Sequence, residues 1–426
     1  MWTIFGEPRK GIHSIRIFDI AIVDLLLAKN PRLEEVDRVH KSALIYAAGM
    51  GNSAIVSKLL LAGAKIDAAY VDGLTPLMWS AGQGHVETVK LLIDKGADPK
   101  LRDDRGMTAF DIAKSNKHAD VLALFAKLKI VVPAYQIFST NEGSQDISVI
   151  DGIKDEVIAT ITDVGKPRGL TFCKNDNRLF VSDQKNEQLL AIDVIAHKVL
   201  DRVKLGESPE AVYCSPDGKL IAISNEGSNS VSFISSKDLK LVFSIKVRGK
   251  NPEHSVFSPD GRLMFVSAEE ADQVDVLDVV EKKQIASIQV GERPRGIAFT
   301  PDGRIAFVAV ESVSRLVAID VPTMQVIQKL QIGQRTNGVL MHPNGKILFA
   351  TNGGDGTVSV IDVHTYQLLT QVPVGQRPWN MSINPDGTKL YVAAGRSNQV
   401  NVIDTATFTP LKSISVGRLP WGTASN

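Results

Sequence analysis

A repeat of about 42 residues, found seven times from about residue 135 to the end, constrains the fold of this chain most strongly. Each copy reads as four short strands. One of them opens at a proline or threonine, and another ends in a Val-Ile-Asp-like triplet. The opening residues are Pro167, Pro209, Pro252, Pro294, Thr336, Pro378 and Pro420. Four strands per 42 residues, repeated seven times, predict an all-β seven-bladed propeller.

The phase of this repeat also predicts how the ring closes. The chain enters the pattern at the second strand of a copy, near Tyr135, and ends on a first strand, Leu419-Pro-Trp-Gly-Thr-Ala-Ser425. We expect this last strand to complete the first blade, because an unpaired edge would otherwise remain. Pro-Asp-Gly at 216–218, 259–261, 301–303 and 385–387 predicts turns between strands. The aspartates that end the triplets lie in different blades, so they are expected to cap turns rather than to form a catalytic pair.

A second, shorter period of 33 residues occupies the first part of the chain. Ala43, Pro76 and Ala109 start equivalent helices, and Gly63 and Gly96 close two others. Repeated helix pairs bury their apolar faces only against neighbouring copies, and three or more copies are needed for stability. The pattern therefore predicts an all-α solenoid in residues 1–130, followed by the propeller in residues 131–426.

The helical copies resemble ankyrin repeats, most clearly in Asp72-Gly-Leu-Thr-Pro-Leu-Met78. Thr75 is suited to cap the helix that begins at Pro76, and Met78 stands where that family usually has a histidine. The expected copies are a degenerate one at 12–37, two regular ones at 38–70 and 71–103, and a cap at 104–127. The resemblance implies a protein partner bound on the concave face.

The blades resemble the YVTN family of bacterial propellers, and within it the propellers associated with PQQ-dependent alcohol catabolism. The stretches that carry this resemblance are Ser-Asn-Glu-Gly-Ser-Asn-Ser-Val at 224–231, Arg293-Pro-Arg295, Val374-Gly-Gln-Arg-Pro-Trp379 and Val416-Gly-Arg-Leu-Pro-Trp-Gly422. The resemblance implies a periplasmic protein accessory to a quinoprotein oxidation system. No export signal is visible in the sequence, so the cytoplasm is the alternative location.

Composition removes several classes of function. The net charge is +1 and the basic residues are scattered among acids, so no nucleic-acid partner is expected. No apolar run is long enough for a membrane span. CxxC, CxxCH and HExxH motifs are missing, and we expect no catalytic residue, no metal and no cofactor. Cys173 and Cys214 occupy matching positions in neighbouring blades and are expected to be small buried core residues.

The propeller nevertheless offers a candidate ligand site at one mouth of its channel. The residue after each strand opening should lie on a common rim, and these residues are Arg168, Glu210, Glu253, Arg295, Asn337, Trp379 and Trp421. The next position is mostly small but is His254 in one blade, which predicts a satisfied or channel-lining histidine, with a metal or general-base role as the alternative. Trp379, Trp421 and Arg168 would suit a flat, anionic or quinone-like ligand; the alternative is that both tryptophans plug the channel.

In the helical part, Tyr46, Trp79 and Ile112 recur at the 33-residue period. They are predicted either to anchor a partner on the concave face or to pack between adjacent repeats. The favoured function is a non-enzymatic protein-interaction scaffold that binds protein partners through the ankyrin concave face and through a face of the propeller. The alternative is a propeller enzyme or small-ligand carrier, either lactonase-like, with Glu210, Glu253 and His254, or quinone-binding.

Overall fold

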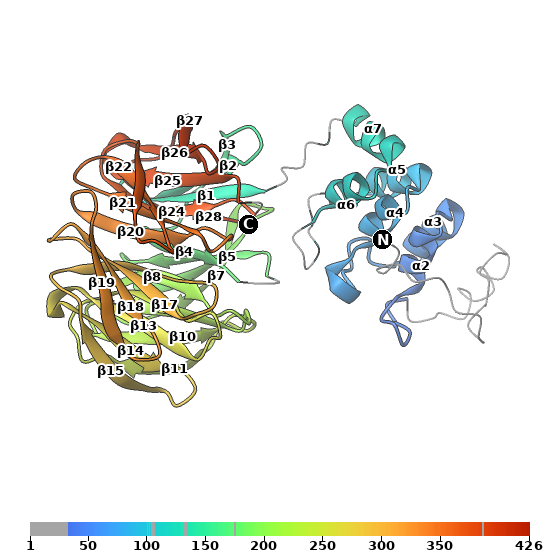
Figure 1. Ribbon diagram of the computed structural model, residues 1–426. Coiled ribbons are helices and arrows are strands. Elements are labelled where there is room, and N and C mark those ends of the chain that lie inside the picture. Colours follow the sequence, from blue (N-terminus) through green and yellow to red (C-terminus); the bar gives the residue numbers. More distant parts are fainter. Residues whose placement is uncertain are drawn as a thin grey trace. The chain divides into compact units, whose positions relative to one another are not determined.

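The computed structural model describes residues 33–99, 101, 103, 107–128, 130, 135–173, 176–385 and 387–426. The chain divides into two compact units, Met1–Val132 and Pro133–Asn426 (Figure 1). The degenerate repeat expected at 12–37 lies almost entirely outside the described residues. Among those residues, no helix has both the length and the apolar character that crossing a membrane requires.

The first unit consists of helix pairs, as the 33-residue period predicts. Its helices are α2 (Ala43–Gly49), α3 (Ser53–Leu61), α4 (Pro76–Gly82), α5 (Val86–Asp94), α6 (Ala109–Ser115) and α7 (Ala119–Lys127), with a short 3-10 turn η1 (Val71–Gly73) before α4. The inner helices α2, α4 and α6 contact one another in order, and so do the outer helices α3, α5 and α7. One continuous apolar core results, which no single pair could form alone.

Local chemistry explains where these helices begin and how the repeats are joined. Thr75 Oγ1 accepts a hydrogen bond from the Met78 N–H at 3.3 Å, and the Met78 sulfur accepts one from the Thr75 N–H at 3.4 Å. The predicted cap is thus present, with sulfur in place of the usual imidazole. His85 and His118 each donate from Nε2 to a carbonyl oxygen of the preceding repeat, at 3.0 and 2.9 Å.

The second unit is a ring of seven four-stranded antiparallel sheets. The first strands of the blades are β28 (Pro420–Ser425), β4 (Pro167–Phe172), β8 (Pro209–Cys214), β12 (Pro252–Phe257), β16 (Pro294–Phe299), β20 (Thr336–Met341) and β24 (Pro378–Ile383). The second strands are β1 (Gln136–Asn141), β5 (Arg178–Asp183), β9 (Leu220–Asn225), β13 (Leu263–Ala268), β17 (Ile305–Val310), β21 (Ile347–Asn352) and β25 (Lys389–Ala394).

The outer half of each blade follows in the same order. The third strands are β2 (Asp146–Asp151), β6 (Gln188–Asp193), β10 (Ser230–Ser235), β14 (Gln273–Asp278), β18 (Arg315–Asp320), β22 (Thr357–Asp362) and β26 (Gln399–Asp404). The fourth strands are β3 (Glu156–Ile161), β7 (Lys198–Lys204), β11 (Leu241–Lys246), β15 (Lys283–Gln289), β19 (Gln325–Gln331), β23 (Leu368–Pro373) and β27 (Thr409–Ser415). The short 3-10 turns η2 (Glu269–Ala271) and η3 (Gly395–Ser397) join the second and third strands of two blades.

The predicted ring closure is confirmed. The sheet order β28-β1-β2-β3 places the last strand beside the first one, and the two lie together in Figure 1. Their register pairs Phe138 with Ala424 and Ser139 with Thr423. The Gln136 N–H also donates to Asn426 Oδ1 at 2.7 Å. The two ends of the propeller sequence thus form one blade.

The sequence features that were predicted to mark strand ends do so, but the second strands begin earlier than predicted. Every first strand begins at the expected proline or threonine, and every third strand ends at the last residue of its triplet. Asp193 Oδ1, for example, accepts from the N–H groups of Ile195 and Ala196, both at 2.8 Å, so it caps a turn. The second strands begin two residues earlier than their buried aromatic residues, such as Phe180, indicated.

The expectation for the two cysteines was incomplete. Cys173 is buried in an apolar cluster and Cys214 packs against it, as expected, but the two also form a disulfide with a Cα–Cα distance of 5.2 Å. Cys173 directly follows β4 and Cys214 is the last residue of β8, and these strands lie side by side in adjacent blades. Matching repeat positions therefore brought the two sulfur atoms together, which the 41-residue separation could have indicated.

Candidate functional site

The seven first strands surround the axis of the propeller, each in contact with the first strands of its two neighbours. Because they are equivalent in the repeat, the residues after their opening positions meet at one end of the channel. Two ion pairs between residues 42 apart, Arg168 with Glu210 and Glu253 with Arg295, show this directly. The predicted rim therefore exists as a set of neighbouring side chains.

Arg168 is engaged within the protein and does not line the mouth cavity. Its Nη1 lies 2.6 Å from both carboxylate oxygens of Glu210, and its Nε donates to Glu142 Oε2 at 3.0 Å. Glu210 is fully buried, and burial raises its pKa although the charge of Arg168 opposes this. Leaving either partner alone would be costly, so the pair is a structural part of the rim.

A second ion-pair group surrounds Arg295. Its guanidinium bonds Glu253, lies 3.0 Å from Glu269 Oε2 and donates from Nε to Glu311 Oε2 at 2.8 Å. Arg295 is 8% exposed, and the nearby Asn337 is 7% exposed. Hence Arg295, Glu253 and Asn337 belong to the buried wall of the channel rather than to its open surface.

Three carboxylates near this group form the described arrangement closest to a metal site. One oxygen each of Glu226, Glu253 and Glu269 lie within 4.8 Å of one another. Arg295 bonds two of these three residues, and Arg293 bonds Glu269 from the solvent side. Since arginines already pair with Glu253 and Glu269, and Glu226 accepts a hydrogen bond from Ser208 Oγ at 3.1 Å, the cluster is best explained as part of the ion-pair network.

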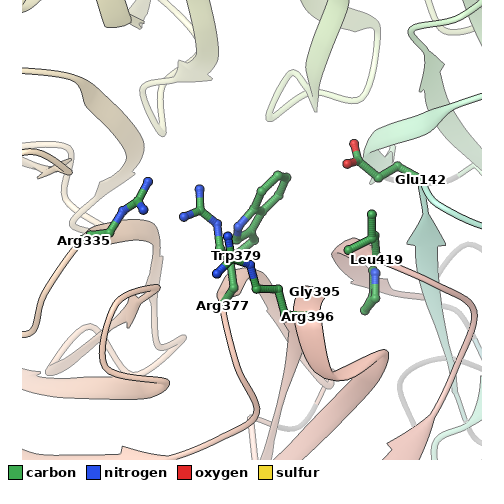
Figure 2. A pocket seen from close by; sticks show the side chains of 8 residues that line it. Glu142, Arg335, Arg377, Trp379, Gly395, Arg396 and Leu419 are labelled. Atoms are coloured by element: carbon green, nitrogen blue, oxygen red, sulfur yellow. The ribbon is translucent and has the colours of Figure 1, made fainter.

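The mouth itself holds a cavity of about 360 Å3. Its lining residues are Glu142, Arg335, Arg377, Trp379, Gly395, Arg396, Leu419 and Pro420. Figure 2 shows Arg377 and Arg396 beside Trp379, Arg335 farther to one side, and Glu142 and Leu419 on the opposite side. Of the predicted rim residues, Trp379 is the one that faces this cavity.

The arginines of this cavity carry more positive charge than their acidic partners balance. Arg335 bonds Glu311 at 2.7 Å, whereas Arg377 approaches the same carboxylate only to 3.8 Å. Burial lowers the pKa of Arg377, and the positive charge of Arg335 lowers it further. Arg396 forms no ion pair with any residue that the structure describes. The cavity is therefore suited to an anion.

The sequence-based prediction placed the rim directly after each strand opening, so it did not include Arg335 and Arg377, which lie directly before the openings. Both have a left-handed backbone, with φ of 53°. The same position is Arg293 in the blade before them. Three arginines in successive blades, at a position where most blades have a left-handed residue, were a readable signal of a charged arc.

The two tryptophans of the rim face different spaces. Their ring centroids lie 6.2 Å apart in an edge-to-face arrangement. Trp379 lines the mouth cavity, whereas Trp421, 4% exposed, and His254 line a second cavity farther along the channel. They therefore form a wall between two cavities, and the predicted joint platform of Trp379, Trp421 and Arg168 is not assembled.

In the ankyrin unit, the three recurring residues differ in exposure. Tyr46 is 38% exposed and its hydroxyl donates to Asp37 at 2.5 Å. Trp79 and Ile112 are 7% and 3% exposed and belong to the apolar core, with the Lys41 Nζ 4.1 Å from the centre of the Trp79 ring. Packing between repeats accounts for Trp79 and Ile112, and Tyr46 is the member that offers a surface.

Fold and channel together define a fusion of an ankyrin array with a seven-bladed propeller. Residues 156–410 match the family described as lactonase, 7-bladed β-propeller, and the chain belongs to this family. Residues 44–134 match ankyrin repeats in three copies, which are typical protein-interaction modules. The finer resemblance to propellers of PQQ-dependent alcohol catabolism stays a prediction.

Curated relatives match only short stretches. Palmitoyltransferase AKR1 of Saccharomyces cerevisiae is 39% identical over 74 residues, which are 17% of this chain and 10% of that protein. The putative E3 ubiquitin-protein ligase XBAT34 of Arabidopsis thaliana is 37% identical over 93 residues, 21% of this chain and 25% of that protein. The chain thus spans a quarter or less of the length of these relatives.

Solved structures share the fold at low identity. Hydrazine synthase of Kuenenia stuttgartiensis has a TM-score of 0.56 at 21% identity, over 62% of this chain and 90% of that chain. A protein of unknown function from Desulfotomaculum acetoxidans has a TM-score of 0.62 at 16% identity, over 68% and 98%. At these identities the likeness concerns the fold alone.

Proposed function

We propose that this protein is a two-module binding protein, with an ankyrin array that binds a protein partner and a propeller that binds a small planar anion at its channel mouth. The observation that carries the second part is the single cavity that Arg335, Arg377, Arg396 and Trp379 line together, with Arg377 against the Trp379 ring. Planar guanidinium groups recognise carboxylate or phosphate through paired hydrogen bonds, and an indole face adds stacking for a flat ligand.

Arg377 is the residue on which this proposal depends most. Its guanidinium carbon lies 5.4 Å from the centre of the Trp379 ring, and its nearest acidic group is 3.8 Å away. An anion seated between Arg377 and Arg396 would relieve the repulsion among the arginines. Binding should therefore weaken with rising salt, as expected for partly exposed charges.

We expect Arg377→Ala to weaken binding of a flat aromatic carboxylate about 10- to 100-fold, because a hydrogen bond to a charged group contributes about 1.5–3 kcal/mol. Titration calorimetry with pyrroloquinoline quinone, a planar tricarboxylate, and with phenyl phosphate measures this effect and compares the two anion types. Trp379→Ala should weaken both as well, through lost stacking.

Arg262→Ala is the matched control, because Arg262 lies in the turn between β12 and β13, at the other end of the blade, and is 70% exposed. It should leave both affinities unchanged. Equal affinity of native protein and Arg377→Ala for both anions would contradict the anion site. Preference for the quinone would support the predicted link to a quinoprotein system.

Lactone hydrolysis is the second candidate function, and the family match over residues 156–410 favours it. Glu142 is the only carboxylate among the described residues that line the mouth cavity, and its side chain is 14% exposed. As a general base it would take a proton from water while the water oxygen attacks the lactone carbonyl. The arginines would stabilise the oxyanion, and the ring oxygen would leave with a proton to give a hydroxy acid.

Under this second candidate, Glu142→Gln should lower kcat about 100- to 10,000-fold while an anionic lactone still binds. The assay compares a phosphorylated aldonolactone with δ-valerolactone, corrected for spontaneous hydrolysis. Hydrolysis by the native protein at the uncatalysed rate would remove this candidate and leave the binding function.

The proposal also includes the cellular compartment in which the protein works. The disulfide between Cys173 and Cys214 supports a location where disulfides persist, such as the periplasm, rather than the cytoplasm. We further propose that Tyr46, the exposed member of the recurring ankyrin residues, contributes to the partner surface.

A further inference from the structure

The second cavity of the channel is a chamber of about 280 Å3 that shares no lining residue with the mouth cavity. Most of its wall is apolar, formed by successive first strands. The apolar lining includes Leu170, Val212, Val256, Ile297, Leu340 and Met381. A chamber of this kind, with a few polar groups in an apolar wall, is the usual form of a small-molecule site.

His254 supplies the main polar group of the chamber. It is 1% exposed, and its Nδ1 lies 2.7 Å from the hydroxyl oxygen of Tyr213. Its Nε2 is buried and has no hydrogen-bond partner among the described residues. Native proteins rarely leave such a group unsatisfied, so this atom marks a place where something from outside the chain binds.

The protonation of His254 follows from its surroundings. Burial lowers its pKa to about 3, and the charge of Arg295 acts in the same direction, so the imidazole is neutral. Burial raises the pKa of Tyr213, which keeps its hydroxyl proton. Nδ1 is the one acceptor for the Tyr213 hydroxyl among the described residues, so we assign the hydroxyl proton to this hydrogen bond, which places the single ring proton on Nε2. The Asn380 amide also lines the chamber, and the fully buried donor in its wall is the His254 N–H.

An aromatic surface stands next to this donor. The Trp421 ring lies nearly parallel to the imidazole, with an interplanar angle of 15° and centroids 6.2 Å apart. Both rings line the chamber. A charged ligand would lose its hydration against the apolar wall, so the chamber favours a neutral one.

We propose that this chamber binds a small neutral, largely apolar molecule whose carbonyl oxygen accepts a hydrogen bond from His254 Nε2–H. An apolar cavity of about 150 Å3 suffices for benzene, so the larger volume here fits a bicyclic compound. The site is independent of the anion site at the mouth, because the two are lined by different residues.

The test compares 1-tetralone with tetralin, which differ in the carbonyl group alone. The full-length protein should bind both saturably in titration calorimetry, and 1-tetralone more tightly. His254→Phe removes the donor and keeps an aromatic ring. It should therefore weaken the affinity for 1-tetralone about three- to tenfold and leave the affinity for tetralin unchanged. His254→Gln, which retains an N–H donor, should restore part of the difference.

Two further measurements keep the test decisive. Arg262→Ala should leave 1-tetralone binding unchanged, since Arg262 lies in an exposed turn between β12 and β13 and lines neither cavity. In the native protein, nitrogen NMR of the imidazole should show the Nε2–H signal shift on addition of 1-tetralone, even if the variants fail to fold. Lack of saturable 1-tetralone binding, or an equal loss of tetralin binding in His254→Phe, would overturn the proposal; the first result would mean that water alone satisfies Nε2.

Discussion

Deletion of residues 418–426 should unfold the propeller. These residues include β28, which pairs with β1 along its length and contacts β24 and β4 on either side. Its loss removes buried Trp421 and Ala424 and exposes the edge of β1. Truncating one buried tryptophan costs about 3–5 kcal/mol, and a whole domain has only about 5–15 kcal/mol of stability. We expect aggregation or loss of the cooperative transition in thermal denaturation followed by circular dichroism.

Deletion of Asn426 alone is the control for this truncation. It removes two hydrogen bonds with Gln136, one from the Gln136 N–H and one to the Gln136 carbonyl oxygen, but leaves every residue of β28 in place. The cost should be about 1–3 kcal/mol. A synthetic peptide of residues 418–426 should also restore folding of the truncated protein when added in excess. An unchanged melting temperature after the longer deletion would show that closure by β28 does not stabilise the ring.

The propeller could be predicted from sequence because its strand boundaries depend on local chemistry. Pro167 and the other opening prolines lack an N–H and start strands, and aspartates such as Asp193 satisfy the N–H groups of the following turn. Such signals act within a few residues, so they can be read from the sequence without knowing which strands lie side by side. Ring closure followed from the phase of the same signals.

The channel site was only half predictable, because ion pairing depends on contacts between blades. The rim position was identified, but the sequence could not indicate that Glu210 would bind Arg168 and leave it unavailable. Arg377 was missed because it lies one position before the strand. Its left-handed backbone directs the side chain differently from those of the strand residues that follow it. The disulfide was missed for a similar reason, since it joins two blades rather than two nearby residues.

Replacement of Arg295 should cause the largest loss of stability from a single substitution in the rim. Arg295→Met leaves Glu253 without its arginine partner and removes one partner each from Glu269 and Glu311. Glu269 keeps Arg293 and Glu311 keeps Arg335. Breaking a buried ion pair by removing one partner costs about 3–5 kcal/mol. Arg293→Met is the matched control, because Arg293 is 45% exposed and an exposed pair contributes about 0–1 kcal/mol.

The loss in Arg295→Met should also shrink as the pH falls. In the native protein, burial and the charge of Glu253 raise the pKa of Glu269. Burial acts in the same direction on Glu311, but Arg295 and Arg335 outweigh it, so the pKa of Glu311 is lowered. Without Arg295, Glu269 keeps its burial and the repulsion of Glu253 but loses one of its two arginine partners, so its folded-state pKa rises further above that of the unfolded chain. As the pH is lowered, the folded variant therefore binds a proton at a higher pH than the unfolded chain does. Its free energy of unfolding rises as the pH falls toward the unfolded pKa of about 4.3.

The native protein responds in the opposite sense through Glu311, whose lowered pKa provides stability that is lost as the pH falls through the folded-state value. That loss begins only below the unfolded pKa of about 4.3, so between pH 8 and 5 the gap narrows because the variant gains stability. Urea denaturation at pH 8, 6.5 and 5 should therefore show a difference in unfolding free energy that is largest at pH 8. A gap that stays constant over this range would mean that Arg295 acts by filling space, and that the three carboxylates find other partners once it is gone.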